Sequence, residues 1–382
     1  MDKLKENFKK HLQTICLTYP TRHTASEGER FAADYIEKYF LGLGIKCRRE
    51  EYPVRGWDYK EHCIKNASKN EEIPTVTVCY FSGELDFVGK LTVLEKYEDV
   101  LEKDVKGKVC LLAFFTGDVF KNNEIAEDLE KLGALGVIFY DESTNNGLAS
   151  TKICRSPFIN KIAVMAVSNY GLRYLLANIE DDYSIYINAM PYDTITDNVI
   201  GYIEGGDKKA VFGAHYDAAP LIEGADDDAS GVAMLLETAR ILRDCKTEYT
   251  IEFVAFSGEE YIAKRGTVPE GSGDYVKRHK DEVAWYFNFD SSGTTSKLMT
   301  KYTLGIGHIE KLQGIDFGRE YKDATMMGDD KAFVLSGIPT IWLQAVSKEF
   351  FYHTPNDNVK SIDFNAMCDV YKEMYGLMMK LL

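Results

Sequence analysis

The chain has 382 residues, with 45 basic and 60 acidic side chains and a net charge of −15. This acidic balance argues against nucleic acid or an anionic membrane surface as the main partner. The length exceeds what one hydrophobic core usually supports, so we expect two domains.

The eight cysteines are scattered, and no Cys-x-x-Cys pair occurs. In a chain of this length they indicate reduced, buried thiols rather than a disulfide framework. The N-terminal segment MDKLKENFKKHLQTIC is charged and amphipathic, without the apolar core of a signal peptide. No apolar run approaches the about 20 residues that cross a bilayer. We therefore expect a cytoplasmic protein.

A helix is predicted after Ser26-Glu27-Gly28-Glu29, a capping box in which serine and glutamate side chains satisfy N–H groups at a helix start. The residues that follow, RFAADYIEKYFLGLG, repeat apolar side chains at helical spacing and end in two glycines. IKCRREEYPV is predicted to be extended.

From about Gly56 the pattern changes to short strands with one or two helices. The expected strands are TVTVCYF, KLTVLEKY, KVCLLAFF, VIFYD and KIAVMAVS, and the expected helices are IAEDLEKLGA and YGLRYLLANI. A set of this size makes a self-sufficient small α/β domain. We place this domain at residues 61–190, inserted between residues 1–60 and residues 191–382 of a discontinuous second domain.

After Asp193, apolar strands alternate with helices. The strands are AVFGAHYD, TIEFVAFS, AWYFNFD and IPTIWLQA; the helices include ASGVAMLLETARIL, capped by Asp227 or Asp228, and the closing FNAMCDVYKEMYGLMMKLL. This alternation predicts an α/β fold with a mostly parallel or mixed central sheet flanked by helices. Ligand sites of such sheets form beyond the carboxyl ends of the strands.

Five strand or loop ends of this region carry side chains that bind metals. They are His215-Tyr216-Asp217, Asp226-Asp227-Asp228, Glu259-Glu260, Asp290 and His353. Singly, each has an ordinary explanation: a histidine satisfied by hydrogen bonds, a helix-capping aspartate, or a solvated glutamate pair. Together, at one edge of one sheet, they indicate a metal site, because buried carboxylates need a compensating cation.

A hydrolase that uses two metal ions holds them about 3.5–4 Å apart and needs one carboxylate to bridge them. Asp227, at a helix start, is the candidate bridge. His215 with Asp290 would complete one ion, and His353 with Glu260 the other. Zinc accepts this mixture of nitrogen and carboxylate ligands.

Two further acids have candidate roles beside the ligands. Neighbouring side chains on an extended strand point to opposite faces, so Glu259 would face the water that the metal activates while Glu260 binds metal. Asp217 would accept the second ring N–H of His215 and fix its tautomer, or would cap a loop.

Four blocks of the sequence, GAHYDAAPLIEGADDDASGVAMLLETARIL, FVAFSGEEYIAKRGT, FNFD and YHTPNDNVKSID, resemble the signature blocks of the co-catalytic two-zinc aminopeptidases. They stand in that family's order. The resemblance implies two zinc ions, with cobalt or manganese as substitutes, and peptides with a free N-terminus as substrates. It implies that Asp227 rather than Asp226 bridges, that Glu259 is the base and Glu260 a ligand, and that Tyr352 steadies the oxyanion.

The inserted segment resembles a protease-associated domain through DVKGKVCLLAFF, the helix that ends in KLGALGVIFYD, and AVMAVSNYG. This resemblance implies a lid or substrate-access role without catalytic residues. Two departures from the aminopeptidase pattern leave the side-chain preference open. Gly328-Asp329-Asp330 stands where relatives often have Ser-Asp-His, and YIAKRGT follows the glutamate pair.

Other hydrolase classes lack their motifs here, since there is no His-Glu-x-x-His and no Gly-x-Ser-x-Gly. A glutaminyl-cyclase-like acyl transferase would not need the two-metal set. A carboxypeptidase would need a cationic clamp for the substrate's carboxylate, which the sequence does not reveal. An inactive peptidase that serves as a binding scaffold would be expected to have lost ligands or the base.

Overall fold

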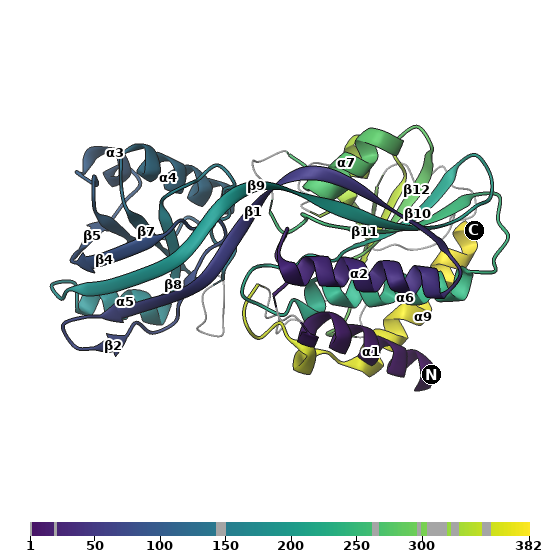
Figure 1. The fold of residues 1–382 in the computed structure, drawn as a ribbon, viewed down its shortest axis with the longest axis horizontal. Coiled ribbons are helices and arrows are strands. Elements are labelled where there is room, and N and C mark those ends of the chain that lie inside the picture. The colour runs from purple at the N-terminus through teal and green to yellow at the C-terminus, as the bar shows by residue number, and fades with distance from the viewer. Residues whose placement is uncertain are drawn as a thin grey trace.

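The computed structural model describes residues 2–18, 21–142, 150–261, 267–295, 299–303, 319–321, 328–345 and 353–382. The ribbon has two lobes joined by two long strands (Figure 1). These are β1 (Lys46–Asn66) and β9 (Tyr183–Ile203), which pair antiparallel along their whole length. The domain boundaries placed at residues 61 and 190 therefore fall inside continuous strands, and Gly56 marks no break in the chain's secondary structure.

The larger lobe is built on a mixed sheet, which confirms the expected fold class. Its ten described strands run in the order β14-β13-β15-β12-β10-β11-β9-β1-β2, and β4 pairs with β9. The parallel centre consists of β10 (Lys209–His215), β11 (Thr250–Phe256), β12 (Val283–Phe289) and β15 (Thr340–Gln344). Beyond β15 lie β13 (Met299–Thr303) and β14 (Arg319–Tyr321), whereas β2 (Glu71–Glu72) and β4 (Leu85–Gly89) pair with the ends of β1 and β9 that run into the smaller lobe (Figure 1).

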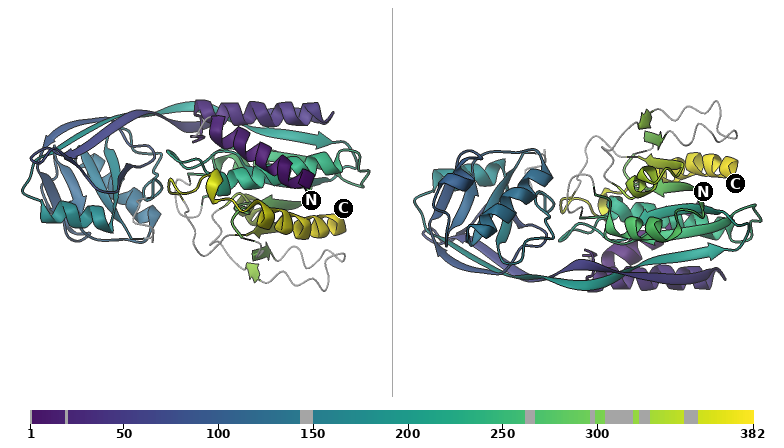
Figure 2. Two further views of the ribbon diagram at one scale, coloured as in Figure 1. Left: turned by 90° about the horizontal axis from the view of Figure 1, so that it is seen from below. Right: turned by 90° about the horizontal axis from the view of Figure 1, so that it is seen from above.

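Helices cover both faces of this sheet, because successive strand side chains alternate between two apolar cores. Phe212 of β10 faces the core that includes residues of α1 (Asp2–Thr18), α2 (Glu27–Gly42), α6 (Gly231–Leu242) and α9 (Phe364–Leu381). Its neighbour Val211 faces the core under α7 (Glu270–His279) and α8 (Asp330–Leu335). Figure 2 shows the N-terminal and C-terminal helices lying beside each other on this lobe.

The smaller lobe has a separate sheet in the order β3-β8-β7-β6-β5. Its strands are β3 (Val76–Val78), β5 (Leu91–Leu94), β6 (Val109–Leu112), β7 (Gly136–Asp141) and β8 (Ala163–Ser168), and its helices are α3 (Asp99–Glu102), α4 (Val119–Lys131) and α5 (Asn169–Ala177). Each lies within or beside a segment expected from the sequence, except the short α3. Helix α4 begins earlier than expected, because Asp118 accepts a hydrogen bond from the Phe120 N–H at 3.0 Å and caps it there.

The N-terminus of α2 only partly follows the capping-box pattern. The Ser26 hydroxyl accepts the Glu29 N–H at 3.1 Å, as expected, but the Glu29 carboxylate accepts the N–H of Ala25 rather than that of Ser26. The same carboxylate accepts hydrogen bonds from the hydroxyls of Thr196 on β9 and Ser257 after β11. Glu29 therefore connects the helix start to two strands of the sheet.

The junction between the lobes is aromatic. Tyr261, which follows the glutamate pair, packs against Tyr80 and Phe81 of the smaller lobe at ring-centroid distances of 5.9 and 5.1 Å. The buried core of the smaller lobe includes Tyr261. The loop that carries Glu259 and Glu260 is thus attached to the smaller lobe as well as to its own sheet.

All eight cysteines are free thiols, as expected, although Cys63 is exposed and Cys47 and Cys245 are only partly buried. Among the described helices, none combines the length and the apolar content that a membrane span requires.

The fold predicts an unusual pH dependence of stability. Burial, followed by the charge of Asp217, raises the pKa of Glu29 to about 8 from its ordinary 4.5. The native state therefore holds a proton that the unfolded chain has lost, and the free energy of unfolding falls as the pH rises through this window. In Glu29→Gln we expect the loss of stability from about pH 5 to about pH 8, measured by denaturant unfolding, to shrink by at least about 1 kcal/mol. If Glu29→Gln loses as much stability over this pH range as the wild type does, Glu29 is not the group that holds the proton.

Candidate metal centre

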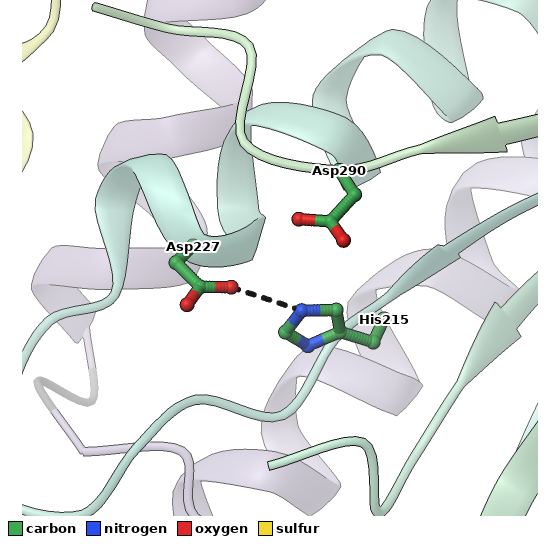
Figure 3. A group of neighbouring side chains, drawn as sticks. All are labelled: His215, Asp227 and Asp290. Carbon is green, nitrogen blue, oxygen red and sulfur yellow. Dashed lines mark hydrogen bonds and ion pairs between the residues drawn. The ribbon is translucent and has the colours of Figure 1, made fainter. Parts of the chain in front are cut away.

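The predicted ligands meet at the carboxyl edge of the sheet. His215 is the last residue of β10, Asp290 follows β12, and the glutamate pair follows β11. These three strands are adjacent and parallel, so their ends lie side by side. Asp227 lies in the turn Ala225–Ser230 before α6, and Figure 3 shows its carboxylate and that of Asp290 directed toward the His215 ring.

Asp227 lies between the two histidines. Its Oδ1 is 3.0 Å from His215 Nε2, and its Oδ2 is 3.0 Å from His353 Nε2. All three side chains are buried. One carboxylate oxygen thus faces each imidazole, which is the arrangement that a bridging ligand requires.

The neighbouring aspartates have other partners. Asp226 turns its carboxylate to the Gly293 N–H at 2.6 Å. Asp228 accepts the Gly231 N–H at 2.9 Å and the Ser291 N–H at 3.0 Å. Of the two capping candidates, Asp228 therefore satisfies the start of α6, and Asp227 is directed into the cluster.

The tautomer of His215 is set by its own strand end. Its Nδ1 lies 3.1 Å from the backbone carbonyl oxygen of Asp217, which can only accept a hydrogen bond, so Nδ1 carries a proton. In the neutral ring, the Nε2 lone pair then faces Asp227. Because a lone pair and a carboxylate oxygen at 3.0 Å are both acceptors, a proton or a metal ion must lie between them.

Ligand atoms within 4.8 Å of one another form three groups of residues. They are His215, Asp227 and Asp290; Asp227, Glu260 and His353; and His215, Glu259 and Glu260. The first two are the ligand sets expected from the sequence, and Asp227 belongs to both.

The carboxylates are held in an environment that disfavours their negative charge. Burial, and then the charge of Asp227, raises the pKa of Asp290. Burial is also the largest cause of the raised pKa of Glu260 and of Glu259. Burial and the nearby charge of Lys152 lower the pKa of His353 and favour its neutral, ligating form.

Alternation along a strand, the predicted reason for the different roles of Glu259 and Glu260, is wrong. They lie in the loop after β11, not on the strand, and this loop turns at Gly258 with a positive φ of 67°. Glu259 Oε2 is 3.9 Å from His215 Nε2, whereas Glu260 Oε2 is 3.6 Å from His353 Nε2. The loop conformation directs each glutamate to a different histidine.

Asp217 also differs in detail from the prediction. It follows β10 instead of lying on it, and its backbone carbonyl, not its carboxylate, is the closer partner of His215, with Oδ1 at 3.5 Å from Nδ1. Its carboxylate accepts the N–H groups of Glu259 at 3.2 Å and Glu260 at 3.1 Å. Asp217 thus orients the glutamate loop as well as lying beside the histidine.

Sequence reasoning missed several residues around the cluster. Asp357 accepts the N–H groups of Asp226 and Asp227 at 2.7 and 3.2 Å, and it stands in the same YHTPNDN block as His353. Lys152 and Arg155 reach the cluster from the smaller lobe, and no motif indicated them. Tyr352, expected near the oxyanion, lies outside the described residues.

The residues present fit zinc. Two imidazoles and three carboxylates are the ligand types that zinc takes in hydrolases. Glu260 Oε1 is buried and lacks a hydrogen-bond partner among the described residues, as expected for an oxygen positioned for a cation. The cluster is therefore a candidate centre for metal-dependent hydrolysis.

The model of peptidase family M28 matches residues 198–378, a region that contains all five predicted ligands. This part of the chain, residues 198–378, is therefore similar to peptidase family M28. The chain is 27% identical over 287 residues to aminopeptidase YwaD of Bacillus subtilis, covering 70% of this chain and 60% of that protein. It is 30% identical over 290 residues to a probable leucine aminopeptidase 2 of Arthroderma benhamiae, covering 74% and 57%. The match thus spans less than two thirds of either relative's length.

Two solved structures share the fold. A zinc aminopeptidase from Bacillus subtilis has a TM-score of 0.73 at 19% identity and covers 96% of this chain and 92% of its own. An aminopeptidase from Aneurinibacillus sp. strain AM-1 has a TM-score of 0.65 at 22% identity, with coverage of 96% and 91%. The similarity therefore extends over both lobes.

The geometry predicts that Asp227 and Asp226 differ in their importance for metal binding. Asp227→Asn keeps the size of the side chain but removes the charge between the two histidines. We expect zinc affinity, measured by calorimetry after chelation and dialysis, to fall by more than about 10²-fold. Asp226→Asn is the matched control, since its side chain faces the Gly293 N–H, and it should bind zinc nearly as the wild type does. An equal loss in both variants would refute the assignment.

Proposed function

We propose that the protein is an aminopeptidase that uses two zinc ions and removes N-terminal residues from peptides. The observation that carries the proposal is the position of Asp227, with one oxygen 3.0 Å from His215 and the other 3.0 Å from His353. Asp290 and Glu260 supply a separate carboxylate to each histidine. The M28 match and the named aminopeptidase relatives support the same activity.

The residues have distinct tasks in peptide hydrolysis. Bound zinc supplies Lewis acidity, which polarises the scissile carbonyl and lowers the pKa of water toward neutrality. Glu259 has a carboxylate oxygen within 4.8 Å of ligand atoms of His215 and Glu260, one residue from each proposed metal-binding group. It takes the proton of the attacking water. Burial raises the pKa of Glu259, which suits a carboxyl group that must accept a proton and then deliver it to the leaving amine.

The excess of negative charge also suits the substrate's free α-ammonium group. Asp290 and Glu259 are buried beside other carboxylates, so a cation is favoured there over a neutral group. We propose that these acids select peptides with an unblocked N-terminus.

We also propose that residues 61–190 form a protease-associated domain that controls substrate access. The five-stranded sheet with α4 and α5 and its attachment beside the glutamate loop support this reading. The resemblance implied no catalytic residue in this domain, but two of its cations, Lys152 and Arg155, contact Glu260.

A carboxypeptidase is the second candidate, and these two cations favour it. Arg155 donates from Nη1 to the backbone oxygen of Glu260 at 2.9 Å, and Lys152 bonds the Glu260 carboxylate. Buried cations beside a hydrolytic centre are what recognition of a substrate carboxylate would require. The two candidates differ in which blocked peptides they would hydrolyse.

A panel of aminoacyl arylamides and short peptides separates these candidates. After zinc loading we expect release from members with a free N-terminus, none from their N-acetylated counterparts, and none after chelation. Amidation of the C-terminus should leave turnover of the peptides nearly unchanged. Hydrolysis of acetylated peptides that stops on amidation would instead establish a carboxypeptidase.

The assignment of Glu259 predicts a separation of binding from chemistry. Glu259→Gln should retain bound zinc, while kcat falls by at least about 10²-fold, which is the usual contribution of a positioned base. Glu282→Gln is the control, because that exposed residue pairs with Lys209 at the opposite end of the strands. Near-normal kcat in Glu259→Gln, with zinc bound, would exclude Glu259 as the base.

A further inference from the structure

Lys152 belongs to the smaller lobe, but its ammonium group lies in the metal centre. Its side chain is only 4% exposed. Nζ lies 2.7 Å from His353 Nε2 and is hydrogen-bonded to Glu260 Oε2. Both partners belong to the group formed by Asp227, Glu260 and His353.

The loop that carries Lys152 is fixed to the body of its own lobe. Asn122 of α4 donates from Nδ2 to the Ile153 carbonyl at 2.8 Å. The next residue of the helix, Asn123, accepts the Arg155 N–H at 2.8 Å. Both asparagines are buried. The position of the Lys152 backbone is therefore tied to α4, and displacing it involves the smaller lobe.

The same loop also holds the backbone of the metal centre. Arg155 is buried and donates from Nη1 to the carbonyl of Glu260, at the residue whose side chain Lys152 bonds. Two cations of one lobe thus engage one residue of the other. Such desolvated contacts are favourable only while the charges remain paired.

An ammonium group and a metal ion need the same atoms here. A Lys ammonium has only donors, so its contact with His353 Nε2 uses the imidazole lone pair. A zinc ion would need that lone pair and an oxygen of Glu260 at about 2.0–2.2 Å. Two cations within hydrogen-bond distance of the same ligand atoms would also repel each other. Occupancy by one therefore excludes the other.

We propose that Lys152 is a tethered cation that competes with metal for Asp227, Glu260 and His353, so that this group takes an ion only when the smaller lobe withdraws Lys152. The inference rests on the proposed two-zinc function and adds its regulation. The group of His215, Asp227 and Asp290 loads first and tightly. Binding of the second ion is then coupled to the position of the smaller lobe, so that lobe controls whether both ions are present for hydrolysis.

The test is zinc binding to the full chain, followed by calorimetry and elemental analysis. In Lys152→Met we expect the second zinc ion to bind at least about 10-fold more tightly than in the wild type, because no competing cation must leave. The chelated variant should also unfold at a lower temperature, since Glu260 loses its buried partner. Lys90→Met is the matched control, because Lys90 is an exposed lysine of the same lobe that pairs with Glu180, and it should change neither quantity.

Second-ion binding that is unchanged or weaker in Lys152→Met would overturn the proposal. Calorimetry counts bound ions without requiring turnover. Unchanged binding of the second ion can therefore be distinguished from failure of the proposed function, in which ions bind but no peptide is cleaved. If Lys152→Met does not fold, chemical labelling of the wild-type protein tests the same proposal. Acetylation of Lys152, followed by mass spectrometry, should accelerate at least about 10-fold on zinc saturation, with Lys90 as the unchanged reference. Equal labelling with and without zinc would refute the withdrawal of Lys152.

Discussion

The arrangement of the metal centre depends on one constraint, the free-energy cost of burying several carboxylates at one edge of the sheet. Asp227, Asp290, Glu259 and Glu260 are all nearly inaccessible to solvent. Isolated buried carboxylates would be protonated or would destabilise the fold, and burial raises the pKa of several of them accordingly. Cations offset this cost. The same constraint therefore explains why the histidines and carboxylates fit zinc, and why Lys152 of the smaller lobe lies beside Glu260.

The acids of the centre divide into two kinds by the partners of their oxygens. Asp217, Asp226, Asp228 and Asp357 accept backbone N–H groups, which fix the loops around the cluster. Asp227 instead directs both oxygens at imidazole nitrogens. Acids satisfied by the backbone are committed to structure, and those facing other side chains are the ones that remain to bind a cation.

The two lobes are coupled through one short loop. Glu260 bonds Lys152, its carbonyl accepts Arg155, and the next residue, Tyr261, packs into the core of the smaller lobe. Asp217 holds the same loop from the side of the larger lobe. A shift of the smaller lobe would therefore act on Glu259 and Glu260 through these contacts.

The sequence by itself determined the fold class, the strands and the helix that carry the site, and the identity of the clustered His, Asp and Glu residues. These follow from local signals, because apolar periodicity sets the elements and parallel strands bring their carboxyl ends to one edge. Only the tertiary structure decided that Asp228 rather than Asp227 caps α6, that Asp217 holds the Glu259–Glu260 loop, and that Lys152 enters the centre. The last two depend on contacts between residues far apart in the sequence, since Asp217 lies 42 residues from Glu259 and Lys152 lies 108 residues from Glu260. Such long-range contacts leave no periodic or local mark in the sequence, since they arise only when separate elements pack together.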